Sequence, residues 1–175
     1  MKFKIKGKRA SRNDYLSTFI NTTVEHGSTV LDIGCGPKAY STPLLAQDCT
    51  VLTIDAWAWV EPDIVANVET TPIHEITPNR WDYILMIDFI EHLDKPAGIQ
   101  LLEDCKKIVN KKIIILTPLP VIWTDNTENV ARKDLWCHGN EFDVHKSSWT
   151  ADDFVGWQQI QLPTLANYYV GYYEA

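Results

Sequence analysis

The chain has 175 residues, of which 45% are hydrophobic, and a formal net charge of −7. This length predicts one globular domain, 1–175, with an ordinary core. No apolar run approaches the roughly 18 residues of a membrane span, and no apolar stretch follows the basic first residues, so we expect no membrane anchor and no signal peptide. Four scattered cysteines without a C-x-x-C pair predict reduced thiols in a cytoplasmic protein, with no metal site and no disulfide framework.

Charge is unevenly distributed along the chain. Residues 1–12 form a basic N-terminal arm with six of the 16 Lys and Arg, while the remaining chain has ten against 23 acids. The acidic body argues against broad nucleic-acid binding, although the arm could still contact phosphate or an anionic substrate. A solvated tail or a short edge strand is the alternative interpretation of the arm.

Apolar runs alternate with helical stretches, which is typical of an α/β domain with a parallel sheet covered by helices on both faces. The last strand follows its predecessor closely, so we expect the two to be antiparallel. Residues 118–149 show no clear periodicity, and long irregular segments in compact domains are usually functional, which predicts a substrate or lid loop. The expected helices are 14–25, 39–46, 96–109 and 151–155, and the expected strands are 29–33, 50–54, 63–66, 82–87, 112–117, 157–162 and 168–173.

The first motif in chain order is at residues 30–37, VLDIGCGP, where a buried strand turns into a helix. Gly34 and Gly36 would let backbone N–H groups approach a ligand closely. With Ala39 these glycines also fit the dinucleotide-binding pattern. Asp32 separates the two ligands, because it would repel a pyrophosphate by roughly 1 to 4 kcal/mol at contact but suits the sulfonium and ammonium groups of S-adenosylmethionine. A tight turn without a ligand is the structural alternative.

These residues resemble motif I of the class I S-adenosylmethionine-dependent methyltransferases, (Asp/Glu)-x-Gly-x-Gly-x-Gly. Asp32, Gly34 and Gly36 match it, and Lys38 stands in place of the third glycine. The resemblance covers nearly the whole chain. It implies a single Rossmann-like, doubly wound domain with a seven-stranded, mostly parallel sheet and an antiparallel last strand. It also implies S-adenosylmethionine as cofactor, S-adenosylhomocysteine as product, and Cys35 as part of the cofactor-binding turn.

Asp55 ends the second strand, 21 residues beyond Gly34. This is the usual position for an acid that accepts hydrogen bonds from the ribose hydroxyls. Ala56 and Trp57 follow it and could cover the ribose or the adenine edge. Solvation of the acid and ordinary packing of the tryptophan are the alternatives.

Residues 63–68, DIVANV, resemble the adenine-binding segment of the same family. Asn67 stands where Asp is commoner, with Val68 next to it. An amide can accept from the adenine amino group and donate to a ring nitrogen. Asn67 and Val68 are therefore predicted adenine contacts.

Residues 81–93, WDYILMIDFIEHL, resemble the strand-four segment of small-molecule methyltransferases, often Glu-x-x-Glu-His-Leu, with Asp88 in place of the first Glu. At the carboxyl end of a central strand, Asp88 should face the methionine end of the cofactor or the substrate. Glu91 and His92 allow a structural interpretation as readily as a catalytic one. The segment lacks the Asn/Asp-Pro-Pro-Tyr of amino-methylating DNA enzymes.

The irregular segment 118–149 contains histidines and tryptophans that would suit a lid over an organic acceptor. A base is needed only if the acceptor is a hydroxyl or a protonated amine, and the candidates are His145, His138 and His92, in that order. A surface or packing role is the alternative for each. Thr150 and Asp153 form a capping box that should start the next helix.

Together these motifs predict an S-adenosylmethionine-dependent methyltransferase with an unidentified, small-molecule acceptor. Two alternatives are a non-catalytic cofactor-binding partner subunit and a methyltransferase acting on nucleic acid or protein. A short-chain nicotinamide oxidoreductase would need Tyr-x-x-x-Lys, and no tyrosine has a lysine four residues on.

Overall fold

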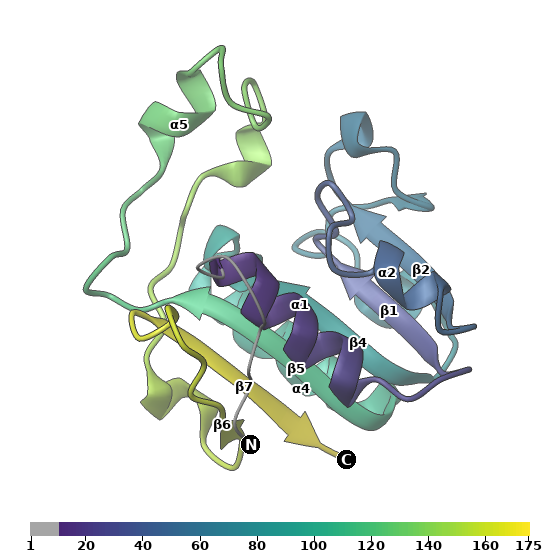
Figure 1. Cartoon of the computed structure of the whole chain (residues 1–175). Helices are drawn as coiled ribbons and strands as arrows, with labels where there is room; N and C mark the ends of the chain where they lie inside the picture. The colour runs from purple at the N-terminus through teal and green to yellow at the C-terminus, as the bar shows by residue number, and fades with distance from the viewer. Residues whose placement is uncertain (1–10) are drawn as a thin grey trace.

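The computed structural model describes residues 11–175 and contains a seven-stranded sheet in the order β3-β2-β1-β4-β5-β7-β6 (Figure 1). Adjacent strands from β3 to β5 are parallel, whereas β7 is antiparallel to both β5 and β6. The predicted α/β sheet with an antiparallel last strand is therefore confirmed. The strands are β1 (Thr29–Ile33), β2 (Thr50–Asp55), β3 (Ile64–Val65), β4 (Trp81–Ile87), β5 (Val109–Pro118), β6 (Gln158–Gln159) and β7 (Tyr168–Glu174).

Helices cover both faces of the sheet, with α1 on one side and α4 on the other (Figure 1). Each face has its own core, because the sheet strands are apolar on both sides. Among the described residues no helix has the length and apolarity needed to cross a bilayer. The α-helices are α1 (Arg12–Thr23), α2 (Thr42–Leu45), α3 (Ile73–Ile76), α4 (Lys95–Ile108) and α5 (Thr127–Ala131), and the 3-10 helices are η1 (Ala58–Val60), η2 (Ile90–His92), η3 (Glu141–Asp143) and η4 (Ala151–Phe154).

The first helix begins earlier than predicted and changes the role of one basic residue. Ser11 caps α1 in a capping box with Asp14, so the helix starts at Arg12. Arg12 therefore belongs to the folded domain and not to a tail. The other basic residues of the predicted N-terminal arm lie outside the described residues.

Other helices and strands differ in length from the expected ones. The expected helix 39–46 shrinks to the four residues of α2, and the expected strand 157–162 shrinks to the two residues of β6, which pairs only with β7 at the edge of the sheet. In contrast, β5 is longer than expected because it is hydrogen-bonded on both sides, to β4 and β7. The predicted capping box of Thr150 and Asp153 is present, but it starts one 3-10 turn, η4, in place of an α-helix.

Residues 118–149 rise above the carboxyl ends of the strands as an excursion that carries α5 and η3 (Figure 1). Its two legs are bonded to each other. Trp123 donates its indole N–H to the carbonyl of Ser147 at 2.7 Å, and the amide of His145 donates to the carbonyl of Asp125 at 3.0 Å. These contacts hold the base of the excursion in place beside the sheet.

Candidate functional site

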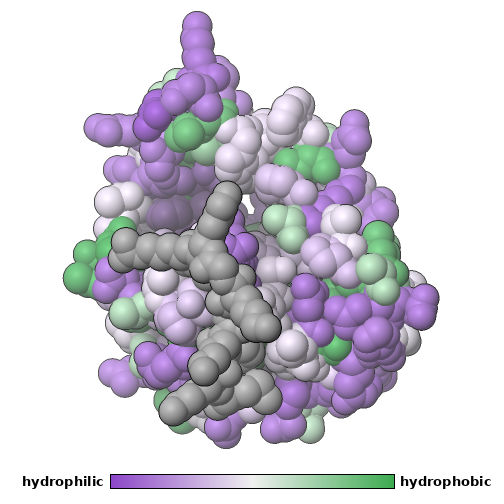
Figure 2. All heavy atoms as spheres, viewed as in Figure 1, coloured by the Kyte–Doolittle hydropathy of each residue, from purple (hydrophilic) through white to green (hydrophobic). Residues whose placement is uncertain are grey.

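A cavity of about 500 Å³ lies at the carboxyl ends of β1, β2 and β4. In the space-filling view the projection that carries α5 and the side built around β1 and β2 meet above a narrow opening (Figure 2). The volume falls within the range of small-molecule sites, roughly 300 to 1,000 Å³. The position is also where open α/β sheets bind ligands.

The glycine turn after β1 forms one wall of this cavity. Gly34 and Gly36 have φ angles of +69° and +47°, and a Cβ on Gly34 would lie 2.0 Å from the ring of Phe89. The turn is tied to β2, because Gly34 donates to the carbonyl of Ile54 at 2.8 Å and Gly36 donates to Asp55 Oδ2 at 3.0 Å. A side chain at position 34 would therefore require both an unfavourable backbone and a displaced Phe89.

Two acids flank the turn. Asp32 is 4% exposed, and burial, together with the nearby charge of Asp55, raises the pKa of Asp32 to about 6. Asp55 also accepts from the backbone N–H of Trp57 at 2.9 Å. A buried carboxylate next to a second one makes this end of the cavity suited to a positively charged ligand.

Nine of the ten predicted cofactor residues line the cavity, and Trp57 does not. The Trp57 ring stacks on Trp59 at a centroid distance of 4.9 Å and lies 6.2 Å from Trp136. Asn67 accepts from the amide of Glu69 at 2.9 Å, which orients its NH₂ group as a remaining donor. The nine are Asp32, Gly34, Cys35, Gly36, Asp55, Ala56, Asn67, Val68 and Asp88.

Asp88 lies in the cavity wall with a partner that sequence reasoning missed. Arg12 donates to both of its carboxylate oxygens, at 2.5 and 3.2 Å, and the Arg12 guanidinium lies 5.0 Å from the ring centre of Tyr168. Burial raises the pKa of Asp88, and Arg12 opposes that shift. The sequence gives no signal for this ion pair, because 76 residues separate its members.

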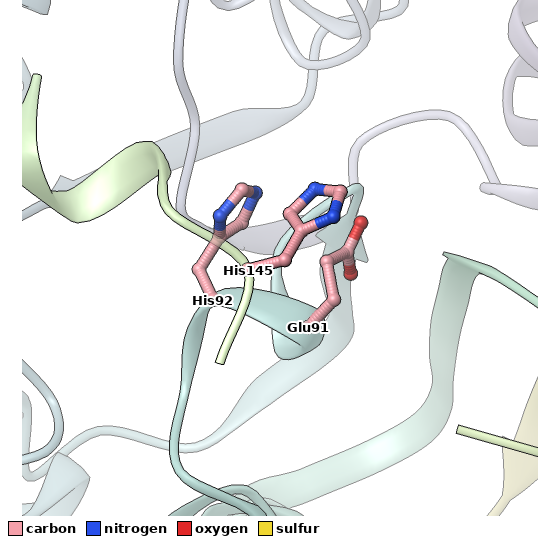
Figure 3. Close-up of side chains that lie close together, drawn as sticks. All are labelled: Glu91, His92 and His145. Carbon is pink, nitrogen blue, oxygen red and sulfur yellow. The ribbon is translucent and has the colours of Figure 1, made fainter. Parts of the chain in front are cut away.

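Glu91, His92 and His145 form a cluster in the same cavity (Figure 3). Glu91 is 1% exposed and accepts from the Thr117 hydroxyl at 2.9 Å, and burial together with the charge of Asp88 raises the pKa of Glu91 well above its usual range. Burial, together with the neighbouring His145, lowers the pKa of His92 to about 4, so this imidazole is neutral. The His92 and His145 ring centres are 4.8 Å apart.

The three candidate bases have different positions. His145 and His92 line the cavity, whereas His138 is exposed, lies outside the lining and places Nδ1 3.2 Å from the carbonyl of Val130. The prediction of His138 as a base is therefore not supported by its position. Other lining residues that sequence reasoning missed come from the irregular segment and from α1: Arg12, Asn126, Asn129, Asn140, Phe142 and Lys146.

No protein-family model matches the chain, and no curated protein matches it by sequence. Solved structures match at the level of fold. An S-adenosylmethionine-dependent methyltransferase from Archaeoglobus fulgidus has a TM-score of 0.64 and 13% identity, over 93% of this chain and 94% of that one. A Rhodobacter sphaeroides protein, provisionally named a Zn-dependent alcohol dehydrogenase, has a TM-score of 0.66 and 11% identity, over 95% and 91%. The magnesium protoporphyrin IX methyltransferase of Synechocystis, solved with bound S-adenosylhomocysteine, has a TM-score of 0.60 and 11% identity, over 93% and 81%.

The chain spans only about half the length of several other matched structures. At such low identities these matches establish the fold alone. The chain has the Rossmann-like fold of class I methyltransferases, as the sequence motifs indicated. Since one structure with this fold bears a dehydrogenase name, the activity has to be argued from the site.

Proposed function

We propose that this chain is an S-adenosylmethionine-dependent methyltransferase that acts on a small-molecule acceptor. The observation that carries the proposal is the pair of acids, Asp32 and Asp55, beside the glycine turn. A dinucleotide would bring a pyrophosphate to this turn and meet repulsion of roughly 1 to 4 kcal/mol for each close pair of charges. A cofactor with a sulfonium and an ammonium group would instead offset the negative charge.

The residues present fit this cofactor. The turn at Gly34 has no room for a Cβ. Asp55, in the cavity wall, would accept from the ribose hydroxyls, and the Asn67 amide would donate to the adenine ring. When bound, S-adenosylmethionine would supply a methyl group on a positively charged sulfur. The protein would mainly align the acceptor with that methyl group, and alignment alone can lower a barrier by roughly 7 to 11 kcal/mol.

The proposed acceptor site lies beneath residues 118–149. Asn126, Asn129, Asn140 and Phe142 line the cavity from this segment and offer a mixture of amide and aromatic groups that is typical of small-molecule sites. The net charge of −7 disfavours a nucleic-acid acceptor. The described cysteines are all unpaired, which supports our assignment of the enzyme to the cytoplasm.

Calorimetric titration of the purified chain with S-adenosylmethionine, S-adenosylhomocysteine and NAD tests the cofactor. We expect micromolar binding of the two sulfur compounds, no binding of NAD, and loss of binding in Asp32→Ala and Asp55→Ala. Asp152→Ala, at an exposed acid outside the cavity, is the matched control. Failure of both sulfur compounds to bind would overturn the proposal.

Turnover needs a separate experiment. The chain is incubated with methyl-labelled S-adenosylmethionine and a pool of small metabolites, and the labelled products are identified by mass. Tight cofactor binding without any labelled product would favour the alternative of a non-catalytic partner subunit.

A further inference from the structure

We propose that Glu91, His92 and His145 bind a divalent transition-metal ion in the wall of the cavity. Each of these side chains offers one donor atom, and the three atoms lie within 4.8 Å of one another (Figure 3). Two ligands of one ion, each about 2.0 to 2.2 Å from it, are at most about 4.4 Å apart. The spacing of the three donors is thus close to the upper limit for one ion, and an ion bound among them would draw them together.

Two buried polar groups of the cluster indicate a bound ligand. The Glu91 carboxyl is 1% exposed, and the Nδ1 atom of His92 is buried without a hydrogen-bond partner. Buried polar groups are normally hydrogen-bonded, and buried charges are normally paired or coordinate a metal. A cation bound here would give Nδ1 of His92 a partner and would place a positive charge next to the Glu91 carboxylate, which accepts from the Thr117 hydroxyl.

The outer contacts of the cluster also match those of a metal site. His145 donates its Nδ1–H to the carbonyl of Thr124 at 2.6 Å, which leaves Nε2 as the atom available to an ion. The Thr117 hydroxyl donates to Glu91 Oε2 at 2.9 Å. Metal-binding histidines typically donate their other N–H to a carbonyl, and metal-binding carboxylates are typically hydrogen-bonded in turn.

Backbone contacts hold the two parts of the cluster together. Glu91 and His92 lie on η2, whereas His145 comes from the second leg of the irregular segment. The amides of Lys146 and Ser147 both donate to the carbonyl of Glu91, at 2.8 and 3.0 Å. The His145 backbone is thus fixed next to η2, and the donors are placed before any ion binds.

The donor set indicates which ions fit. Two imidazoles and one carboxylate suit zinc, cobalt, iron or manganese better than calcium or magnesium, which prefer oxygen ligands alone. Three protein ligands leave at least one coordination position open, as in catalytic metal sites.

The open position suggests the class of acceptor, a step that rests on the proposed function. An acceptor hydroxyl bound there would lose its proton to water more readily. Its oxygen would then bond to the methyl carbon, and the carbon–sulfur bond would break to leave a neutral thioether. The proposed acceptor is therefore an alcohol or phenol, and the transfer is an O-methylation.

The test is a titration of chelator-treated chain with Co²⁺, followed by its visible absorbance and by calorimetry. We expect one site with a d–d absorbance band, and at least 100-fold weaker binding in His145→Ala and in Glu91→Gln. His26→Ala, at an exposed histidine outside the cavity, is the control and should bind Co²⁺ as the parent does. Acetohydroxamate, an oxygen chelator, should change the absorbance if a position is open.

Each outcome decides a separate point. Absence of Co²⁺ binding below millimolar concentration, or equal binding by His145→Ala and the parent, would overturn the metal site. Metal-free His145→Ala should still unfold cooperatively and be only slightly less stable than the parent, because one hydrogen bond to Thr124 is lost, so thermal unfolding separates lost ligation from misfolding. An absorbance that does not respond to acetohydroxamate would overturn the alcohol or phenol acceptor. Binding of S-adenosylmethionine to the metal-free chain tests the proposed function independently.

Discussion

The two walls of the cavity are built in different ways. The wall at β1 and β2 comes from a short stretch of chain, because Asp32, Gly34, Gly36 and Asp55 lie on two adjacent parallel strands and the turn between them. The opposite wall joins α1, η2 and the irregular segment, which are far apart in sequence. Local geometry therefore fixes the proposed cofactor end, whereas long-range contacts assemble the proposed acceptor end.

The walls also differ in whether their acidic side chains are paired within the protein. At the first wall, Asp32 and Asp55 lie close enough to raise the pKa of Asp32. At the second wall, the Asp88 carboxylate has a partner in Arg12. The first arrangement is suited to an incoming cation, whereas the Asp88 carboxylate of the second wall is already paired within the protein.

The largest expected effect is at the glycine turn. Gly34→Ala should lower the free energy of unfolding by about 2 to 5 kcal/mol, because it combines an unfavourable φ with a Cβ 2.0 Å from Phe89. Gly27→Ala is the control, since Gly27 has a φ of +72° but nothing within 4 Å of its Cβ, and about 1 kcal/mol is expected there. Urea denaturation measures both. Equal losses would show that packing against Phe89 does not constrain the turn.

Asp32→Asn should weaken S-adenosylmethionine binding about 10- to 100-fold at pH 8, which corresponds to about 1.4 to 2.8 kcal/mol. The free protein takes up a proton on Asp32 as the pH falls through about 6, so parent affinity should fall below that pH while that of the variant stays flat. Calorimetry from pH 5 to 8 measures this. A parent affinity independent of pH would contradict the role of the ionised carboxylate.

The same substitution has the opposite effect on stability. Because the folded-state pKa of Asp32 is raised, the ionised carboxylate destabilises the free protein above pH 6, and this cost disappears as the pH falls toward 4. Asp32→Asn should therefore be more stable than the parent at pH 8, by about 1 to 3 kcal/mol, and similar to it at pH 4. Thermal unfolding at the two pH values compares them.

At the second wall, Arg12→Ala should cost about 1 to 2 kcal/mol of stability, because it leaves the half-buried Asp88 carboxylate without its partner. Arg12→Ala combined with Asp88→Asn should recover part of this loss. Arg132→Ala is the matched control, since its pair with Asp134 is exposed, and its effect on stability should be much smaller. Equal losses at Arg12 and Arg132 would show that the cavity pair behaves like a surface pair.

The smallest effect is expected outside the cavity. Trp57→Ala should change the dissociation constant for S-adenosylmethionine less than about threefold, because the ring packs on Trp59 and does not line the cavity. Asn67→Ala, at a lining residue, should weaken binding about tenfold by removing a hydrogen bond. Calorimetry compares the two variants. If Trp57→Ala lost more affinity than Asn67→Ala, the predicted contact between Trp57 and the cofactor would be supported.

Much of the fold was predictable because its signals act over short distances. The apolar runs at β1, β4 and β5 and the glycine turn depend on residues within one element and its neighbours. The length of β6 was predicted poorly, because edge pairing limits a strand irrespective of its own sequence. The start of α1 lies two residues before the expected one, because Ser11 and Asp14 form a capping box there.

By itself, the sequence determined the alternation of strands and helices, the order of the motifs and the acid at the end of each of the first two strands. Hydrophobic periodicity, glycine conformation and strand polarity are properties of nearby residues, so they can be recognised without coordinates. Only the tertiary structure decided that Arg12 pairs with Asp88, that His145 and not His138 reaches the cavity, and that Glu91 lies next to two imidazoles. Those contacts join distant segments through packing and backbone hydrogen bonds, which no local pattern in the chain encodes.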